Sequence, residues 1–145
     1  MIGLDTNVLA RYYVEDAADA EAQRQRSAAR RLVESGQPLM VCKTVILELE
    51  WVLRGYYEFP HAEVASVMRH LLDLPHVTVE DRDTVEQALS NAAAGIDFAD
   101  ALHHASYRSC ASVASFDDRK FARRARKLGL APAVVLPHSP EPRGT

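Results

Sequence analysis

Four acidic residues occur where the sequence predicts buried or junctional structure. Asp5 ends the apolar N-terminal run MIGL, and Glu48 lies within the most apolar helical segment, VILELEWVL. Asp100 opens a segment that is otherwise apolar and small, and Asp117 lies just after the short run SVASF, which is expected to include a strand. Buried carboxylates are costly without a partner, and carboxylates that converge repel each other unless a cation lies between them. Since hard divalent cations prefer oxygen ligands, convergence of these acids would favour a Mg²⁺ or Mn²⁺ site.

Each acid also has a purely structural interpretation. Asp5 can cap the turn that follows it, and we favour an N-cap role for Asp97 over direct metal ligation. Asp100 would be a favourable charge near a helix N-terminus, and one of Asp117 and Asp118 is expected to be a capping residue. Four such acids at successive junctions would nevertheless be a coincidence, so the cation site is the stronger hypothesis.

Glu48 and Glu50 are expected to point in different directions. Two residues apart on a helix, they lie on different faces. The apolar neighbours of Glu48, Val45 and Val52, make it the inward-facing candidate, and Glu50 is then expected to be solvated.

The elements that must position these acids alternate along the chain. Short apolar runs predict strands at 1–5, 38–42, 77–79, 111–115 and 133–136. Helical spacing predicts helices at 6–14, 17–35, 44–55, 61–72, 83–94, 97–110 and 118–128. Gly36, Gly95 and Gly129 are expected to end helices. Strands separated by helices imply parallel pairing and an α/β fold, in which working sites lie at the carboxyl ends of the strands.

Length and composition indicate one globular domain. The chain has 145 residues, of which 48% are hydrophobic and 26% charged, so we expect a domain at 1–136 followed by a flexible C-terminal tail at 137–145. The net charge of −3 does not by itself indicate a nucleic-acid binder. Two cysteines without a CxxC motif exclude a disulfide scaffold and a cysteine-ligated zinc site. Without a signal peptide or an apolar run of membrane-spanning length, a cytoplasmic location is expected.

Four motifs together resemble those of the PIN-domain ribonucleases. They are MIGLDTNVL, LELEWVL, DFADALHHA and ASFDDRKFAR. Among these ribonucleases the chain is most similar to the VapC toxins of type II toxin–antitoxin systems, and the resemblance runs from Met1 to about Leu136. It implies a three-layer α/β/α sandwich around a parallel sheet, and a Mg²⁺- or Mn²⁺-dependent endoribonuclease.

The resemblance also implies roles for individual residues. It places the catalytic, metal-binding carboxylates at Asp5, Glu48, Asp100 and Asp117. It places supporting polar groups at Thr6, Asn7, Asp97 and Ser115. The doubled acid, Asp117 and Asp118, departs from the family pattern and leaves the fourth ligand ambiguous, although position within the motif SFD favours Asp117.

The implied chemistry is hydrolysis of RNA phosphodiesters. A divalent metal polarises the scissile phosphate and lowers the pKa of a bound water, and in-line attack would leave a 5′-phosphate and a 3′-hydroxyl. A basic segment that includes Arg119, Lys120 and Arg123 either grips RNA phosphates or is only a solvated helix face. Paired histidines, His103 and His104, would offer a metal-free route, but a structural role is favoured for them.

The resemblance implies two protein partners. One is a cognate VapB-like antitoxin that blocks the acidic pocket, to which an arginine-rich segment would be suited. The other is a second copy of the chain. The apolar helices around 44–72 are the expected dimer surface, because the short aromatic stretch 51–59 holds Trp51, Tyr56, Tyr57 and Phe59. The alternative is that these rings fill the core of the monomer.

Two other functions compete with the nuclease. A receiver-type phospho-signalling domain has a similar length, an acidic pocket and a Mg²⁺ requirement. The alternative is a catalytically silent PIN-like module that binds RNA. Neither Lys43 nor Lys120 falls where a receiver domain needs a lysine, and the intact set of four acids argues against a silent module.

Overall fold

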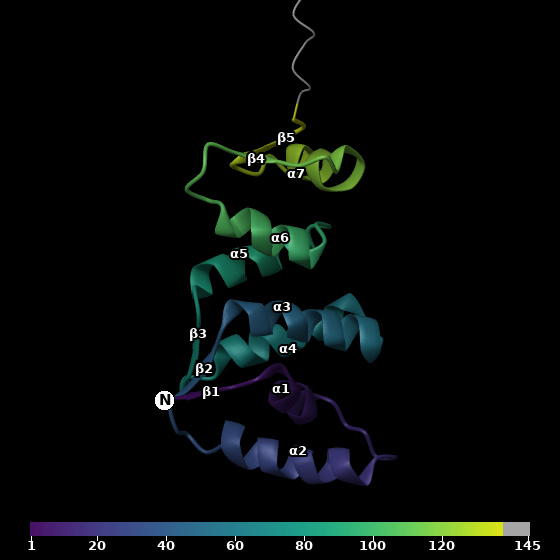
Figure 1. The fold of residues 1–145 in the computed structure, drawn as a ribbon, viewed down its shortest axis with the longest axis vertical. Helices are drawn as coiled ribbons and strands as arrows, with labels where there is room; N and C mark the ends of the chain where they lie inside the picture. The colour runs from purple at the N-terminus through teal and green to yellow at the C-terminus, as the bar shows by residue number, and fades with distance from the viewer. Residues whose placement is uncertain (138–145) are drawn as a thin grey trace, which may run out of the picture. The chain divides into compact units, whose positions relative to one another are not determined.

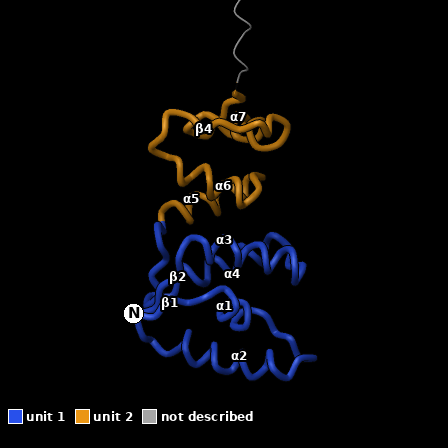
Figure 2. The backbone as a smooth tube through the Cα atoms, viewed as in Figure 1, with its two compact units in different colours: residues 1–82 blue, residues 83–145 orange. Residues whose placement is uncertain are grey.

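The computed structural model describes residues 1–137. Within them the chain forms two compact units that divide after Arg82 (Figure 2). Apart from Pro137, the expected C-terminal tail lies outside the described residues. The single domain at 1–136 stays a prediction.

The first unit contains a parallel three-stranded sheet. Its strands are β1 (Ile2–Gly3), β2 (Leu39–Val41) and β3 (Val77–Val79), in the order β1-β2-β3 (Figure 1). Leu39 lies opposite Ile2 on one side and Val77 on the other. Parallel neighbours require long crossover connections, which the helices supply.

Helices α1 (Thr6–Tyr13) and α2 (Ala20–Val33) connect β1 to β2. Helix α3 (Lys43–Trp51), the π-helical turn η1 (Val52–Tyr56) and helix α4 (His61–Asp73) connect β2 to β3. Helix α1 packs against both α2 and α3. The core of this unit is aliphatic, and its fully buried side chains include Leu9, Val33, Leu39, Val41, Ile46, Leu49, Leu53, Met68 and Leu71.

The second unit combines helices with a two-stranded parallel sheet. Helices α5 (Arg82–Ala93) and α6 (Phe98–Ser106) precede strand β4 (Ser112–Ala114). The π-helical turn η2 (Asp118–Ala122) and helix α7 (Arg123–Lys127) then lead to β5 (Ala133–Val135). Strands β4 and β5 pair with Val113 opposite Val134. Buried residues of this unit include Val85, Ala88, Ala101, Leu102, Phe121, Ala122, Ala125 and Val134.

The predicted α/β class with parallel strands is confirmed. Each predicted helix and strand is present within a few residues, although two helices contain π-helical turns. Gly36 and Gly129 follow α2 and α7 with φ of 79° and 65°, a left-handed conformation that favours glycine. Among the described residues, no helix combines the length and the apolar character that crossing a membrane requires.

The N-terminal strand differs from the prediction of a buried strand. Strand β1 is short and exposed, with Ile2 at 41% exposure. In the three-stranded sheet of the first unit it pairs with β2, and only Ile2 and Gly3 of the predicted strand 1–5 belong to it.

Candidate functional site

Asp5 lies two residues after β1, at the N-terminus of α1. Its Oδ1 accepts a hydrogen bond from the backbone N–H of Thr6 at 2.9 Å, so the capping role proposed for Asp5 is confirmed. The next side chain, Thr6, is only 5% exposed, and its buried Oγ1 has no hydrogen-bond partner. A buried hydroxyl without a partner is unusual and indicates a place where a water, an ion or a ligand group would be stabilised.

Asp5 and Glu48 line the same pocket of the first unit, which has a volume of about 560 Å³. Thr6 and Asn7 lie in its wall as well. Glu48 is exposed there, three residues before the end of α3. The first unit therefore brings two of the four predicted metal-binding acids, and both supporting residues of the motif LDTN, to one cavity.

The predicted orientations of Glu48 and Glu50 are wrong. Glu50 is the buried acid, at 5% exposure, and its Oε1 accepts a hydrogen bond from Arg54 Nε at 2.7 Å. Glu50 lies on the face that buries Ile46 and Leu49, while Glu48 faces the pocket. The ion pair with Arg54 offsets part of the cost of burying Glu50.

This arrangement predicts opposite behaviour for the two acids. Glu50→Ala should lower the free energy of unfolding by about 1–3 kcal/mol, because it leaves the half-buried Arg54 without its carboxylate. Glu48→Ala, the matched substitution two residues earlier, should leave that free energy within about 0.5 kcal/mol of wild type. Urea titrations followed by circular dichroism would measure both. A loss of stability confined to Glu48→Ala would contradict the assignment.

Arg11 and Gln25 also line this pocket, and neither was predicted as a site residue. Arg11 Nε donates to Gln25 Oε1 at 2.8 Å, which holds the two side chains together. Arg11 lies four residues after Asn7 and therefore on the same face of α1. That spacing was the signal in the sequence that could have identified it.

In the second unit, the pKa of Asp100 is affected by burial and by the charges of two other acids. It lies half-buried in the first turn of α6. Burial, followed by the charges of Asp97 and Asp117, raises the pKa of Asp100, while nearby His103 opposes the shift. Asp97 occupies the N-cap position, but its side chain forms no capping hydrogen bond. The predicted cap by this side chain is therefore wrong, and its charge acts on Asp100 instead.

The raised pKa of Asp100 has a consequence for stability. Between the ordinary aspartate pKa of about 3.9 and the raised folded-state value, the folded protein binds more protons than the unfolded chain. The contribution of this group to stability therefore falls as the pH rises through that window, and above it the charged Asp100 destabilises the fold.

Asp100→Asn should consequently raise the melting temperature at pH 7 in metal-free buffer. The gain should shrink as the pH is lowered through the folded pKa, because Asp100 of the wild type is then protonated. Thermal melts of both proteins across this pH range measure the difference. A difference in melting temperature between Asp100→Asn and wild type that grows toward acid pH would contradict the raised pKa of Asp100.

Asp117 is held by its own loop. Its side chain caps η2 through Lys120 N–H at 3.0 Å, and its backbone N–H donates to Ser115 Oγ at 3.0 Å. Asp118 instead pairs with Arg126 at 2.5 Å. Of these two acids, Asp117 is the one whose charge acts on Asp100, so it is the better candidate for the fourth ligand.

The side chains of the basic segment face solvent. Arg119, Lys120 and Arg123 are exposed, whereas Phe121 and Ala122 are buried. An amphipathic segment of this kind places its cations on the outside, directly after Asp117. Both interpretations of the basic segment remain consistent with this exposure.

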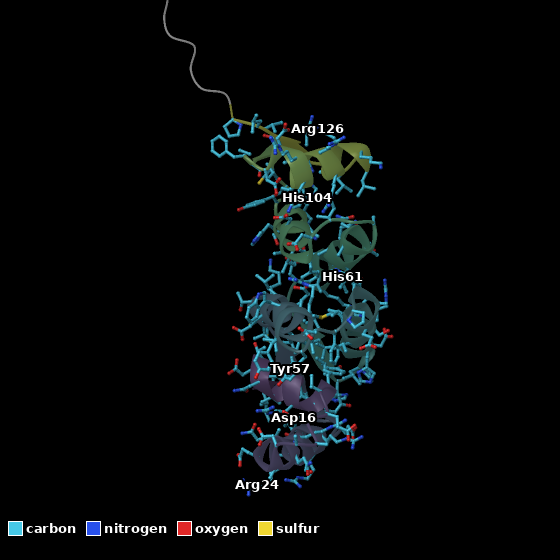
Figure 3. The ribbon with its side chains drawn as sticks, turned by 90° about the vertical axis from the view of Figure 1, so that its right-hand side faces the viewer. Asp16, Arg24, Tyr57, His61, His104 and Arg126 are labelled. Atoms are coloured by element: carbon cyan, nitrogen blue, oxygen red, sulfur yellow. The ribbon has the colours of Figure 1, made fainter. Side chains whose placement is uncertain are left out.

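The two adjacent histidines, His103 and His104, differ in solvent exposure. His104, labelled in Figure 3, is buried, and its Nε2 lies 2.8 Å from the carbonyl oxygen of Pro132. It also packs edge-to-face on Phe121. His103 is exposed. The structural interpretation of His104 is confirmed, and the pair is unsuited to a joint acid–base role.

The donor atoms of both units suit a hard divalent cation. Asp5, Glu48, Asp100 and Asp117 supply only oxygen, and the partnerless Thr6 Oγ1 is a further oxygen. The repulsion that Asp97 and Asp117 each exert on Asp100 is of the kind that a cation relieves. Within residues 1–137, no three His, Cys, Asp or Glu side chains are grouped so as to hold a metal ion. Convergence of all four acids on one cation stays a prediction.

The sequence that forms these strands and helices matches a known family. A family model described as the PIN domain matches residues 2–127. The chain belongs to the PIN domain family. No curated protein matches the sequence. PIN-domain membership gives the chain a nuclease-type fold, which favours the nuclease over the receiver-type alternative.

Proposed function

We propose that this PIN-domain protein is a Mg²⁺- or Mn²⁺-dependent endoribonuclease, and that it is the toxin of a type II toxin–antitoxin system. The observation that carries the proposal is the environment of Asp100, whose pKa is raised by burial and then by the charges of Asp97 and Asp117. A half-buried carboxylate beside two other acids destabilises a fold, so it indicates a function that requires it. The shared pocket of Asp5 and Glu48 supports the same conclusion.

In this proposal Asp5, Glu48, Asp100 and Asp117 would hold the cation. When bound, the cation would neutralise charge on the scissile phosphate and supply a nucleophilic water near neutral pH. Thr6 N–H fixes one carboxylate oxygen of Asp5, and Ser115 fixes the backbone beside Asp117. Asn7 and Thr6 would orient water or substrate in the pocket, and Asp97 would tune the charge at Asp100.

RNA contact is assigned to the basic segment. Arg119, Lys120 and Arg123 are exposed cations next to Asp117, and phosphate contacts of this kind make nucleic-acid binding sensitive to salt. Binding of RNA should therefore weaken as the salt concentration rises. An antitoxin that resembles VapB would compete with RNA by inserting basic side chains among the acids. A homodimer and a cytoplasmic location stay predictions.

Incubation with RNA tests the proposal. The wild-type protein should cut a 3′-labelled structured RNA in Mg²⁺ or Mn²⁺ and leave it intact in EDTA. The products should carry 5′-phosphate and 3′-hydroxyl ends, which ligation and phosphatase treatment identify. Tight RNA binding without cleavage in either metal would support the silent RNA-binding module instead. Cleavage that persists in EDTA would rule out the metal-dependent reaction.

A further inference from the structure

The pocket of Asp5 and Glu48 exposes two aromatic rings that metal chemistry does not use. Trp51 is 59% exposed and Tyr56 is 72% exposed, and both line this pocket. They therefore do not fill the core, which was one of the two interpretations of the aromatic stretch. Large exposed aromatic rings that gather at a cavity indicate a binding surface.

Trp51 is positioned beside the carboxylate. It is the last residue of α3 and follows Glu48 by three residues, so the two side chains lie on one face of the helix. A methyl group built on Gly55 would lie 3.6 Å from Trp51 Cε2 and Nε1. The indole thus rests beside Gly55, while more than half of the side chain remains open to solvent. A ring held in place before binding loses little freedom when a ligand stacks on it.

Tyr56 is supported from a second direction. It packs edge-to-face on Tyr57, with ring centroids 4.8 Å apart and an interplanar angle of 85°. Tyr57, labelled in Figure 3, also lines the pocket, and its hydroxyl accepts a hydrogen bond from Arg11 Nη1 at 3.5 Å. Arg11 is in turn bonded to Gln25. Tyr56 is thus packed on Tyr57, which is itself hydrogen-bonded to Arg11, and these contacts restrict the Tyr56 ring at the pocket.

We propose that Trp51 and Tyr56 form a stacking platform for bases of single-stranded RNA beside the Asp5–Glu48 carboxylates. The proposal rests on the proposed nuclease function for the position of the phosphate. Proteins recognise unpaired RNA by stacking bases on aromatic rings, which accept any base. The amides of Asn7 and Gln25 lie in the same pocket and offer donors and acceptors for base edges. Its volume of about 560 Å³ lies within the ordinary range of ligand sites.

Trp51 is the only tryptophan of the chain and can report the contact directly. The test uses the full-length Asp100→Asn variant, which leaves every residue of this pocket unchanged and keeps the RNA intact. A ten-nucleotide oligouridine should quench the Trp51 fluorescence. An abasic oligonucleotide with the same number of phosphates should not. Equal quenching by both, or none by either, would overturn the proposal.

Substitutions of Trp51 and Tyr56 provide a second test of the stacking platform. In the same background, Trp51→Ala and Tyr56→Ala should each weaken binding of labelled oligouridine about 10-fold, and Trp51→Phe should retain most of the affinity. The matched control is Tyr107→Ala, which removes an exposed aromatic side chain outside the pocket. Unchanged RNA affinity in Trp51→Ala, together with a dimer that becomes a monomer in sedimentation, would overturn the proposal and assign the rings to contact between copies.

Together, the cleavage, fluorescence and affinity measurements distinguish failure of the stacking platform from failure of the proposed nuclease function. If the wild-type protein cuts no RNA but oligouridine quenches Trp51 and both alanine variants lose affinity, the platform stands and the nuclease fails. If RNA is cut but Trp51 shows no response to bases, the nuclease stands and the platform fails.

Discussion

Asp100→Asn is expected to reduce RNA cleavage at least about 100-fold, the largest effect of any single substitution in the second unit. The substitution keeps the size of the side chain and removes the charge that Asp97 and Asp117 oppose. An amide is a poor ligand for the divalent cation that the proposed reaction requires. Initial rates of cleavage of a labelled RNA in Mn²⁺, compared with those of wild type, provide the measurement.

Asp83→Asn is the matched control for this substitution. Asp83 is an exposed acid in the first turn of α5, just as Asp100 lies in the first turn of α6. The control should keep wild-type activity, because Asp83 is not among the four acids proposed to hold the cation and its charge only favours the helix N-terminus. Equal loss of activity in both variants would show that the effect comes from folding. Wild-type activity in Asp100→Asn would remove Asp100 from the catalytic set.

Mn²⁺ is expected to stabilise the wild-type protein strongly and the Asp5→Asn variant weakly. A ligand that binds only the folded state at 100 times its dissociation constant raises the free energy of unfolding by about 2.7 kcal/mol. Asp5 would lose a charged ligand in the variant, while its amide oxygen could still cap α1. Thermal melts with and without Mn²⁺ measure the difference for each protein.

Asp19→Asn separates capping from metal binding in this experiment. Asp19 caps α2 by accepting hydrogen bonds from the backbone of Glu21 and Ala22, much as Asp5 caps α1. Its variant should keep the full Mn²⁺ effect. If Mn²⁺ stabilises the wild type and Asp5→Asn equally, Asp5 does not hold the cation.

Local sequence signals predicted the elements well. The run from Thr6 follows an acid that caps it, and the spacing of apolar residues in 61–72 matches α4 closely. Such signals act within one or two helical turns and need no knowledge of distant contacts. The exposure of β1 could not be predicted in this way, because it depends on contacts with residues distant in the sequence.

The reversed orientation of Glu48 and Glu50 shows where the pattern was misinterpreted. Val45 and Val52 suggested that Glu48 faces inward, yet both valines are only partly buried. Ile46, Leu49 and Leu53 are completely buried and define the core face, on which Glu50 also lies. Their spacing of three and four residues is visible in the sequence, so the correct face could have been chosen by giving weight to the larger side chains.

The site residues were predicted from motif resemblance, while their surroundings were not. The sequence could not show that Trp51 and Tyr56 stay exposed at the pocket of Asp5, since aromatic residues are also common in cores. Nor could it show that Asp97 leaves its helix uncapped and acts on Asp100. Both depend on side-chain contacts that local spacing does not determine.

We propose that Asp5, Glu48, Asp100 and Asp117 together hold one divalent cation. Calorimetric titration of Mn²⁺ into the wild type, Glu48→Gln and Asp117→Asn measures this binding, and each variant removes one charge from a different unit. We expect one Mn²⁺ per wild-type chain and an affinity at least about 10-fold lower in both variants. Wild-type affinity in either variant would show that its acid does not hold the cation.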